Sequence, residues 1–301
     1  MRIDKPGIYC GISEADYRAD PCPVPSLTQS LCKIALERSM RSVRTASPSL
    51  NPNFEPDDDT KFDLGNTAHT MLLGRGKDIV AIDFPDWKTK AAKEAREAAA
   101  AEGKIAVLAE QHVRAAVMAA EARAQLDRHE DRDAFTGGNA EVMIAWQEDG
   151  IWCRALIDWL HEDLRTVDDF KTTGMSVAPH VIGFRALNGG WDLQAAFISR
   201  GLDVLDPTGA GRRRFRFIAQ ETDPPHDLAV MHMTKPWMTM GAKKVSAAMT
   251  LWRAATKTSR WAGYGNRPMT PEYPAYQEKS WLERELSGEF ENNNPDLIFA
   301  G

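Results

Sequence analysis

The sequence of 301 residues is poor in cysteine and lacks the usual nucleotide-binding loops. It has four cysteines, Cys10, Cys22, Cys32 and Cys153, and no two of them form a CxxC pair. A disulfide framework and a zinc ribbon are therefore not indicated. No glycine-rich loop of the phosphate-binding or dinucleotide-binding type is present, which argues against a helicase motor in this sequence.

Long apolar runs are absent as well. No stretch approaches the roughly 18 to 20 uninterrupted apolar residues that cross a bilayer. The first six residues, MRIDKP, lack the apolar run of a signal peptide. We therefore expect a cytoplasmic protein that does not associate with a membrane.

An excess of positive charge is also missing. The 37 Lys and Arg residues against 43 Asp and Glu residues give a formal net charge of −6. This balance argues against a protein that coats nucleic acid by bulk electrostatics. A local basic groove stays possible, because acidic residues gathered at a metal site lower the net charge without changing the charge of a DNA-facing wall.

The composition, 43% hydrophobic and 27% charged, is that of an ordinary globular protein. We expect one domain over 1–301, with a mainly helical part over 1–135 and a sheet with C-terminal helices over 136–301. The periodicity predicts helices over about 27–43, with Ser26 as N-cap, over 61–73, and twice within 88–127, where Gly103 interrupts them. Short strands over 141–146, 151–160 and 166–172 read as an antiparallel meander. A helix over 193–202, strands over 213–221 and 228–233, and a helix from Thr234 to about 261 complete the expected order.

One pair of strands carries the residues that indicate chemistry. A hairpin turn between Asp163 and Leu164 places Asp158 directly opposite Asp169. Period-two alternation also puts Asp169 and Lys171 on the same face of the sheet. Like charges directly opposite each other are destabilising, and Asp is disfavoured in strands, so this arrangement needs an explanation.

A divalent cation is the simplest explanation for the two carboxylates. Oxygen ligands at a partly hydrated site suit Mg²⁺, with Mn²⁺ as a substitute. The competing interpretation is a pair of surface acids on an exposed sheet face, with Lys171 as their counterion. Bulky apolar neighbours on both sides of Asp158 favour the cation, because they place these acids at the border of a core.

These residues resemble a known family. Asp158, followed by Asp169-Phe170-Lys171, is similar to the split PD-(D/E)xK signature of RecB-type nucleases. Residues 65–69, GNTAH, resemble the upstream GxxxH element, and Gln194 begins a match to the QxxxY element. The opening residues 7–13, GIYCGIS, are similar to the N-terminus of the exonuclease VIII (RecE-like) nucleases of phages and prophages. The resemblance runs in order over nearly the whole chain.

The resemblance implies an α/β fold with a PD-(D/E)xK restriction-endonuclease-like core, a mixed central sheet flanked by helices. Asp158 and Asp169 would bind Mg²⁺, His69 would be a further metal ligand, and Lys171 would orient or polarise the attacking water. The implied activity is that of an exonuclease that resects double-stranded DNA ends from 5′ to 3′ in the bacterial cytoplasm. A single-strand annealing protein is the implied partner, and a closed ring of subunits the implied assembly. No cysteine follows Cys153, so we expect no iron–sulfur cluster.

Two alternatives to this activity stay open. The hydrolytic site does not reveal how DNA is threaded, so an endonuclease or an exonuclease of other polarity is a rival within enzymes. A DNA-binding or assembly protein that keeps the fold without turnover is the rival outside them. Intact Asp158, Asp169 and Lys171 argue against the second rival.

Further candidate residues have competing structural interpretations. Glu141 could complete the acidic site, although a Glu at the start of a strand is usually solvated. Gln194 could bond a DNA phosphate or a metal-bound water, against a plain amide on a helix surface; the family Tyr four residues later is Ile198 here. Alternation exposes Arg214 and Arg216 on one face, where they could contact phosphates or form a solvated strand edge.

Overall fold

The computed structural model describes residues 2–55, 64–74, 78–265 and 268–290. The chain divides into two compact units, Met1–Gly263 and Tyr264–Gly301. The second unit holds helix α10 (Ala275–Leu286), in which no residue is buried. Across these described ranges, no helix is both long and apolar enough to span a bilayer.

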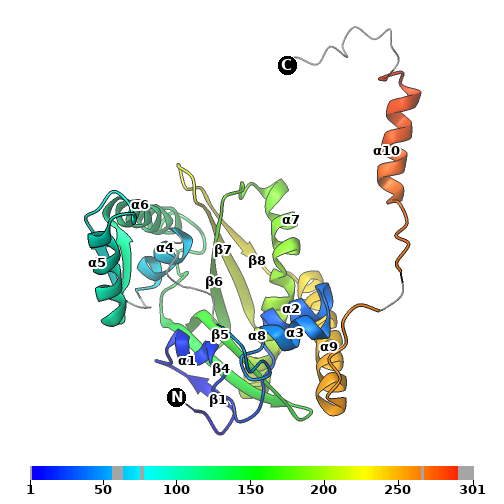
Figure 1. The fold of residues 1–301 in the computed structure, drawn as a ribbon, viewed down its shortest axis with the longest axis horizontal. Coiled ribbons are helices and arrows are strands. Elements are labelled where there is room, and N and C mark those ends of the chain that lie inside the picture. Colours follow the sequence, from blue (N-terminus) through cyan, green and yellow to red (C-terminus); the bar gives the residue numbers. More distant parts are fainter. Residues whose placement is uncertain (1, 56–63, 75–77, 266–267, 291–301) are drawn as a thin grey trace. The chain divides into compact units, whose positions relative to one another are not determined.

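The first unit is built around a six-stranded sheet in the order β1-β4-β5-β6-β7-β8 (Figure 1). Its strands are β1 (Gly7–Tyr9), β4 (Gly138–Glu148), β5 (Ile151–His161), β6 (Thr166–Thr173), β7 (Arg214–Glu221) and β8 (Leu228–His232). Strands β6 and β7 run parallel, and every other neighbouring pair is antiparallel. The mixed central sheet predicted from the sequence is confirmed, and so is the meander, with longer strands than expected.

The meander forms where turn residues and pleated segments agree. Asp149 and Gly150 join β4 to β5, with φ of 49° and 78°, and the flanking residues Glu148 and Ile151 pair across the hairpin. Two consecutive residues at positive φ match the right-handed twist of paired strands, and an Asp-Gly sequence tolerates this conformation. The tight turn therefore fixes the register of β4 against β5.

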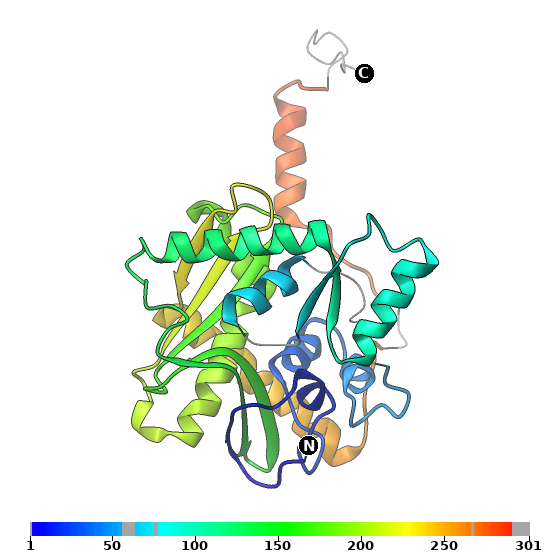
Figure 2. The same cartoon turned by 90° about the vertical axis from the view of Figure 1, so that its left-hand side faces the viewer.

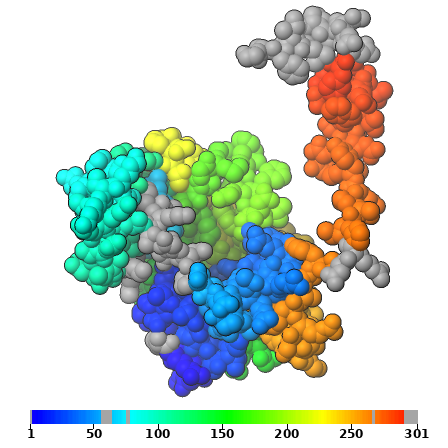
Figure 3. Space-filling view, in the orientation of Figure 1, coloured from blue at the N-terminus to red at the C-terminus, as the bar shows by residue number. Residues whose placement is uncertain are grey.

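Each face of the sheet is covered by a different set of helices. Phe215 and Phe217 of β7 belong to a core with helices α8 (Trp191–Leu205), α9 (Lys235–Thr258) and α2 (Gln29–Glu37). Ile218, the next residue, lies in a second core with helices α4 (Leu64–Leu73) and α6 (Ala109–Leu126). Alternation along one strand thus separates the two cores. On the face drawn in Figure 3, α2 lies against α9.

The connection from β6 to β7 passes through α7 (Pro179–Gly189) and α8, as a parallel strand pair requires. Helix α8 confirms and extends the helix expected over 193–202, whereas α7 was not predicted. The remaining short helices are α1 (Glu14–Arg18), α3 (Met40–Ala46) and η1 (Pro207–Gly209). Helix α9 ends at Thr258, earlier than expected.

The single helix predicted over 27–43 is wrong. The chain forms two helices there, α2 and α3, each with its own cap. The Thr28 hydroxyl caps α2 by accepting a hydrogen bond from Leu31 N at 3.2 Å. Ser26, the expected cap, is buried and donates instead to Asp20.

A smaller set of elements follows α4 in the chain (Figure 2). Strands β2 (Ile79–Ile82) and β3 (Ile105–Leu108) form a parallel pair, with α5 (Lys90–Ala101) as the crossover between them. The two helices expected within 88–127 are confirmed as α5 and α6, but the two strands were not predicted. Residues 61–63 of the expected helix over 61–73 lie outside the described residues.

Candidate functional site

Strands β5 and β6 pair over a short length and then diverge. The paired residues are Leu160 with Val167 and Trp159 with Asp168. Continuing this register by one step places Asp158 opposite Asp169, as predicted from the sequence. At that step the ladder ends, and Phe170 N donates to the Asp158 Oδ2 carboxylate at 2.9 Å instead. The two acids therefore lie at the point where the strands separate.

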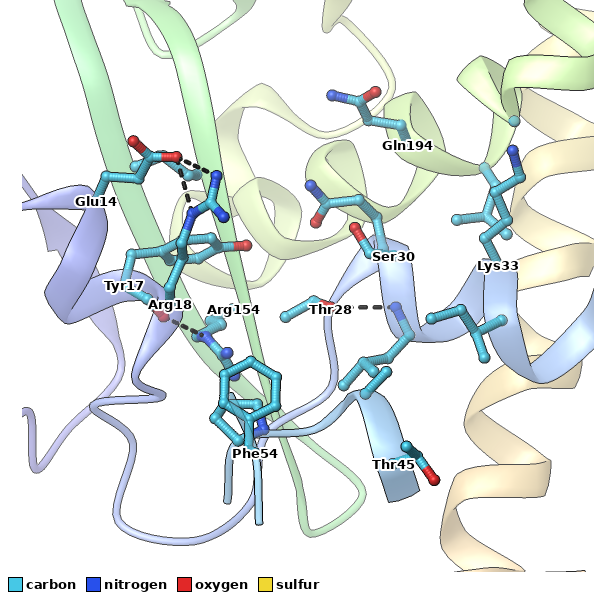
Figure 4. Close-up of a pocket in the computed structure, with 18 of the residues that line it drawn as sticks. Glu14, Tyr17, Arg18, Thr28, Ser30, Lys33, Thr45, Phe54, Arg154 and Gln194 are labelled. Carbon is cyan, nitrogen blue, oxygen red and sulfur yellow. Dashed lines mark hydrogen bonds and ion pairs between the residues drawn. The ribbon is translucent and has the colours of Figure 1, made fainter. Parts of the chain in front are cut away.

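A cleft of about 940 Å³ opens from this point. Its lining includes Arg154, Leu156 and Asp158 along β5, Lys171 of β6, and Gln194 of α8. The opposite wall comes from the N-terminal region, where Tyr17, Thr28, Ser30, Lys33 and Phe54 line the same cleft (Figure 4). The divergence of β5 and β6 thus places two carboxylates, an ammonium and an amide in or beside one hollow.

The predicted site residues on β5, β6, α4 and α8 contact one another. His69 Nε2 lies 3.1 Å from Asp158 Oδ2, and Lys171 Nζ lies 2.5 Å from Asp169 Oδ1. Gln194 Nε2 donates to the other oxygen of Asp169. Helices α4 and α8 pack on opposite faces of the sheet, and both deliver a side chain to this one place.

The two carboxylates have opposite tendencies to ionise. Burial and then repulsion by Asp158 raise the pKa of Asp169 to about 7, against the opposing effects of Lys171 and His69. For Asp158, burial acts in the same direction, but the His69 imidazole and Lys171 outweigh it and lower the pKa. Two acids whose environments separate their pKa values are a common mark of a functional site.

The two basic groups of the site respond to these acids. Burial alone lowers the pKa of Lys171, yet Asp169 and Asp158 together raise it above its usual value. Burial likewise lowers the pKa of His69, and Asp158 raises it by a larger amount. The two acids therefore favour the charged form of both basic groups.

The donor set suits a hard divalent cation in its chemistry. Asp169 is 1% exposed, its Oδ1 lies 2.5 Å from the Lys171 ammonium, and its pKa is raised to about 7 by burial and by Asp158. Two buried carboxylates that repel each other are oxygen donors that a divalent cation would stabilise. Within 2–55, 64–74, 78–265 and 268–290, no three His, Cys, Asp or Glu side chains are already grouped as metal ligands. A cation would therefore compete with His69 and Lys171 for the carboxylates.

Gln194 and Ile198 lie one turn apart on α8 but have different surroundings. Gln194 contacts Asp169, which favours the functional interpretation of this amide over a plain surface position. Ile198 is 0% exposed and packs in the core between α8 and the sheet. The residue in place of the family Tyr is therefore buried and makes no contact with the cleft.

Glu141 lies level with Asp158 on the neighbouring strand. The pairs Ala140 with Trp159 and Val142 with Ile157 flank it, and its own φ is 51°. A non-glycine residue in the left-handed region interrupts the strand at this position. The position is compatible with the acidic site, and a role of Glu141 as metal ligand stays a prediction.

The exposure predicted for Arg216 is wrong. This residue is 0% exposed, and its guanidinium bonds Asp168, Asp131 and Asp133. Arg214 is exposed and donates to Thr166 Oγ1 at 3.2 Å. Both arginines align with residues of β6 that face away from Asp169, so they lie on the other face of the sheet. A phosphate contact by Arg214 stays a prediction, whereas buried Arg216 has no surface to offer DNA.

The sequence interpretation missed the partner of Arg216. Asp168 is 0% exposed, and it accepts hydrogen bonds from Arg216 Nε at 2.6 Å and Phe135 N at 3.0 Å. His161 Nε2 lies 2.7 Å from the same carboxylate. The Asp168-Asp169 doublet was a signal for this arrangement, because adjacent strand residues face opposite sides.

Comparison with known proteins bears on the family and the fold of this chain. A family model described as a PDDEXK-like domain of unknown function (DUF3799) matches residues 36–267. A solved structure from Eubacterium rectale, named "putative exonuclease", is similar, with a TM-score of 0.55 and 12% identity. That match covers 89% of this chain and 98% of the other, and at this identity it shows a shared fold. No curated protein matches the sequence. Because the family model spans most of the chain, the protein belongs to the family of PDDEXK-like domains.

Proposed function

We propose that this protein is a Mg²⁺-dependent deoxyribonuclease that degrades linear double-stranded DNA from its ends. The observation that carries the proposal is the convergence of Asp158, Asp169, Lys171 and Gln194 where β5 and β6 diverge into the cleft. The motif resemblance to exonuclease VIII (RecE-like) nucleases supports 5′-to-3′ polarity. Membership of the PDDEXK-like family agrees with the hydrolytic part of the proposal.

Asp158 and Asp169 are the residues that would hold Mg²⁺ or Mn²⁺, and His69 is the further candidate ligand. Bound there, the ion supplies Lewis acidity and neutralises negative charge on the phosphodiester. The reaction adds water to phosphorus and breaks the P–O3′ bond, leaving a 5′-phosphate and a 3′-hydroxyl.

The chain's own residues orient this chemistry. Gln194 holds Asp169 through its amide, which fixes the carboxylate within the cleft. Lys171 lines the cleft with a side chain 29% exposed, and in this proposal it orients or polarises the attacking water.

The decisive experiment compares end-labelled linear duplex with a covalently closed circle, each with Mg²⁺ and with EDTA. We expect rapid release of 5′-labelled nucleotides from the linear duplex in Mg²⁺ and an intact circle. Equal cutting of the circle would identify an endonuclease, and faster release of a 3′ label would reverse the polarity. Binding without cleavage in any metal would leave a DNA-binding protein.

Lys171 allows a sharper test of the mechanism. Lys171→Ala should reduce cleavage strongly, and Lys171→Arg should not restore it, because a guanidinium does not release its proton at neutral pH. A matched control is Lys33→Arg, which lines the same cleft without contacting the acids. Activity of Lys171→Arg equal to that of Lys33→Arg would remove the proton-handling role.

We also infer a ring of subunits that feeds single strands to an annealing protein, from the motif resemblance alone. A closed ring around the DNA predicts processive digestion and a concentration-independent oligomer. Sedimentation under active conditions measures the oligomer directly. Only monomer, together with dissociation after every nucleotide, would exclude the ring.

A further inference from the structure

A buried arginine connects the N-terminal wall of the cleft to the strand that carries Asp158. Arg154 lies on β5, four residues before Asp158, and is 3% exposed. Both residues line the cleft. Burying a guanidinium is costly unless it is paired and its donors are satisfied, so the partners of Arg154 show what the charge is used for.

Among the described residues, the partners of the Arg154 guanidinium lie in the N-terminal segment. Its Nε donates to the Tyr17 carbonyl at 3.1 Å, and its Nη1 donates to the Ser26 carbonyl at 3.3 Å and to the Ser26 hydroxyl. Its Nη1 also lies 2.9 Å from Asp20 Oδ1, and its guanidinium stacks 5.2 Å from the centre of the Tyr17 ring. One side chain thus binds both ends of a ten-residue loop, 17–26.

Asp20 extends the connection to a second segment of the wall. Its carboxylate accepts hydrogen bonds from Ser26 N at 3.0 Å, from Ser26 Oγ at 2.8 Å and from Ser49 Oγ at 2.7 Å. Asp20 has a φ of 58°, a conformation that Asp tolerates better than most residues. Ser49 precedes Asn51 and Phe54, which line the cleft beside Tyr17 and Thr28.

The backbone next to this pair completes the attachment. Leu27 N donates to the Trp152 carbonyl at 2.8 Å, and Arg154 N donates to the Leu27 carbonyl at 2.9 Å. Leu27 therefore occupies the edge of β5 that β6 leaves when the two strands diverge. The wall is held at one strand position by backbone and side-chain bonds together, and Figure 4 draws the one from Arg154 to the Tyr17 carbonyl.

We propose that Arg154 and Asp20 are a positioning pair that holds the substrate-binding wall at a fixed distance from Asp158. This inference rests on the proposed nuclease function for its consequence, and on the contacts alone for its geometry. Arg154 acts through the wall, since its guanidinium is covered by Tyr17 and paired with Asp20. A lysine cannot replace it, because one ammonium cannot reach Asp20 and the two carbonyls with the same fixed geometry.

The kinetic test uses Arg154→Lys in the full chain. We expect KM for linear duplex to rise about tenfold, as for the loss of one charged hydrogen bond, with kcat nearly unchanged. The Mg²⁺ dependence should stay that of the wild type. A lowered kcat at unchanged KM would overturn the positioning role.

Arg213→Lys is the matched control. Arg213 is also a buried arginine, with a side chain 4% exposed, and it pairs with Asp203 and Asp206 and donates to backbone carbonyls. It does not line the cleft. We expect a comparable loss of thermal stability in both variants and a change of KM only in Arg154→Lys. An equal change of KM in both would show that general loosening explains the effect.

Hydrogen exchange separates this proposal from the proposed function. In Arg154→Lys without DNA, amides over 14–31 and 47–54 should exchange faster, while those of β4 and of β5 beyond Leu156 stay protected. If the wild type cleaves no DNA, the nuclease proposal fails, and the exchange pattern still decides the geometry. Unchanged exchange over 14–31 and 47–54 would overturn the positioning role of Arg154 and Asp20, whatever the nuclease activity.

Ser49→Ala gives a milder version, in case Arg154→Lys does not fold. Ser49 is exposed and contributes one hydrogen bond to Asp20. Its removal should speed exchange over 47–54 more than over 14–31 and raise KM by less than Arg154→Lys does. Unchanged exchange over 47–54 would show that Asp20 does not hold this segment in place.

Discussion

Asp168 and Asp169 are neighbours on β6, and the protein treats their carboxylates in opposite ways. Burial alone raises the pKa of Asp168, but His161 and Arg216 outweigh it and lower the pKa. On the other face, burial and Asp158 raise the pKa of Asp169 to about 7. Asp168 accepts hydrogen bonds on both of its oxygens from buried partners, whereas the Asp169 oxygens contact Lys171 and Gln194, which line the cleft.

The difference separates a structural charge from a functional one. A buried acid with complete hydrogen bonds is stable as it stands and has no capacity left for another ligand. A buried acid beside a like charge is destabilised in its ionised form, and a cation held between the two acids would offset their repulsion. On β6, the face that carries Asp168 therefore stabilises the sheet, and the face that carries Asp169 is suited to bind a cation.

The largest expected effect is the loss of cleavage when an acid on the site face, the sheet face that carries Asp158 and Asp169, is changed. Asp158→Ala and Asp169→Ala should each reduce the rate of DNA degradation by more than the roughly 100-fold lost with outer partners of metal sites. Asp169→Ala should unfold at or above the wild-type temperature, because the raised pKa of Asp169 marks its charge as destabilising. Asp158→Ala should unfold slightly below it, because His69 and Phe170 N lose the carboxylate that they contact.

Cleavage assays and melting curves on the same preparations check both parts. Nearly normal cleavage by either variant would contradict the assignment of the site. A large drop in melting temperature would instead show that these acids support the fold as Asp168 does.

A loss of stability is expected instead on the structural face, the sheet face that carries Asp168 and Arg216. Arg216→Met leaves Asp168 buried without its main partner, and should lower the free energy of unfolding by about 3–5 kcal/mol. Urea denaturation measures the loss. The double variant Arg216→Met with Asp168→Leu should lose less than Arg216→Met alone, since no uncompensated charge stays in the core. A loss below about 1 kcal/mol, as for a surface pair, would contradict the complete burial of this arginine.

Addition of Mg²⁺ should stabilise the folded protein through the site face alone. At a concentration of 100 times Kd, one bound ion raises the free energy of unfolding by about 2.7 kcal/mol. Melting curves of the wild type should shift upward with Mg²⁺, and those of Asp169→Ala should not. An equal shift in both proteins would place the binding elsewhere.

A smaller effect is expected at Ile198, beneath the site. Because Ile198 is fully buried between α8 and the sheet, Ile198→Tyr should overpack the core and cost about 1–3 kcal/mol. Ile198→Val, which removes one methylene group, should cost about 0.5–1.5 kcal/mol. Denaturation and DNA-binding assays check the pair. A Tyr variant with wild-type stability and tighter DNA binding would contradict this assignment.

The sequence allowed prediction of the site because local rules fix its geometry. The hairpin turn determines the register of β5 against β6, and alternation determines that Asp169 and Lys171 share a face. His69 and Gln194 were located only by motif resemblance, since their distance from the acids depends on how α4 and α8 pack on the sheet. The structure brings these four side chains and Asp158 together.

The sequence did not allow prediction of the charge network around Arg216. Its partners Asp131 and Asp133 precede it by more than eighty residues, and alternation cannot tell which face of a strand other elements cover. Strands β2 and β3 were missed for a related reason. Each has four residues, and their parallel pairing forms only across the intervening α5.

The smallest expected effect concerns the outer edge of the structural face, where His232 Nε2 lies 2.7 Å from Asp131 Oδ2. Burial raises the pKa of Asp131, but the hydrogen bonds from His232 and Arg216 outweigh it and lower the pKa. An acid whose pKa is lower in the folded state stabilises the fold above its unfolded pKa, and this contribution is lost as pH falls through the folded pKa. His232→Gln should therefore cost less than about 1 kcal/mol at pH 5 to 6, since His232 is half exposed. The difference from the wild type should shrink as the pH falls from about 4, the ordinary pKa of an unfolded aspartate, through the lower folded pKa of Asp131. Urea denaturation of both proteins from pH 3 to 6 measures the difference, with His180→Gln on α7 as a control outside the network. A difference that grows as the pH falls would show that His232 acts through another group, and that the paired face of the sheet extends less far than Asp131.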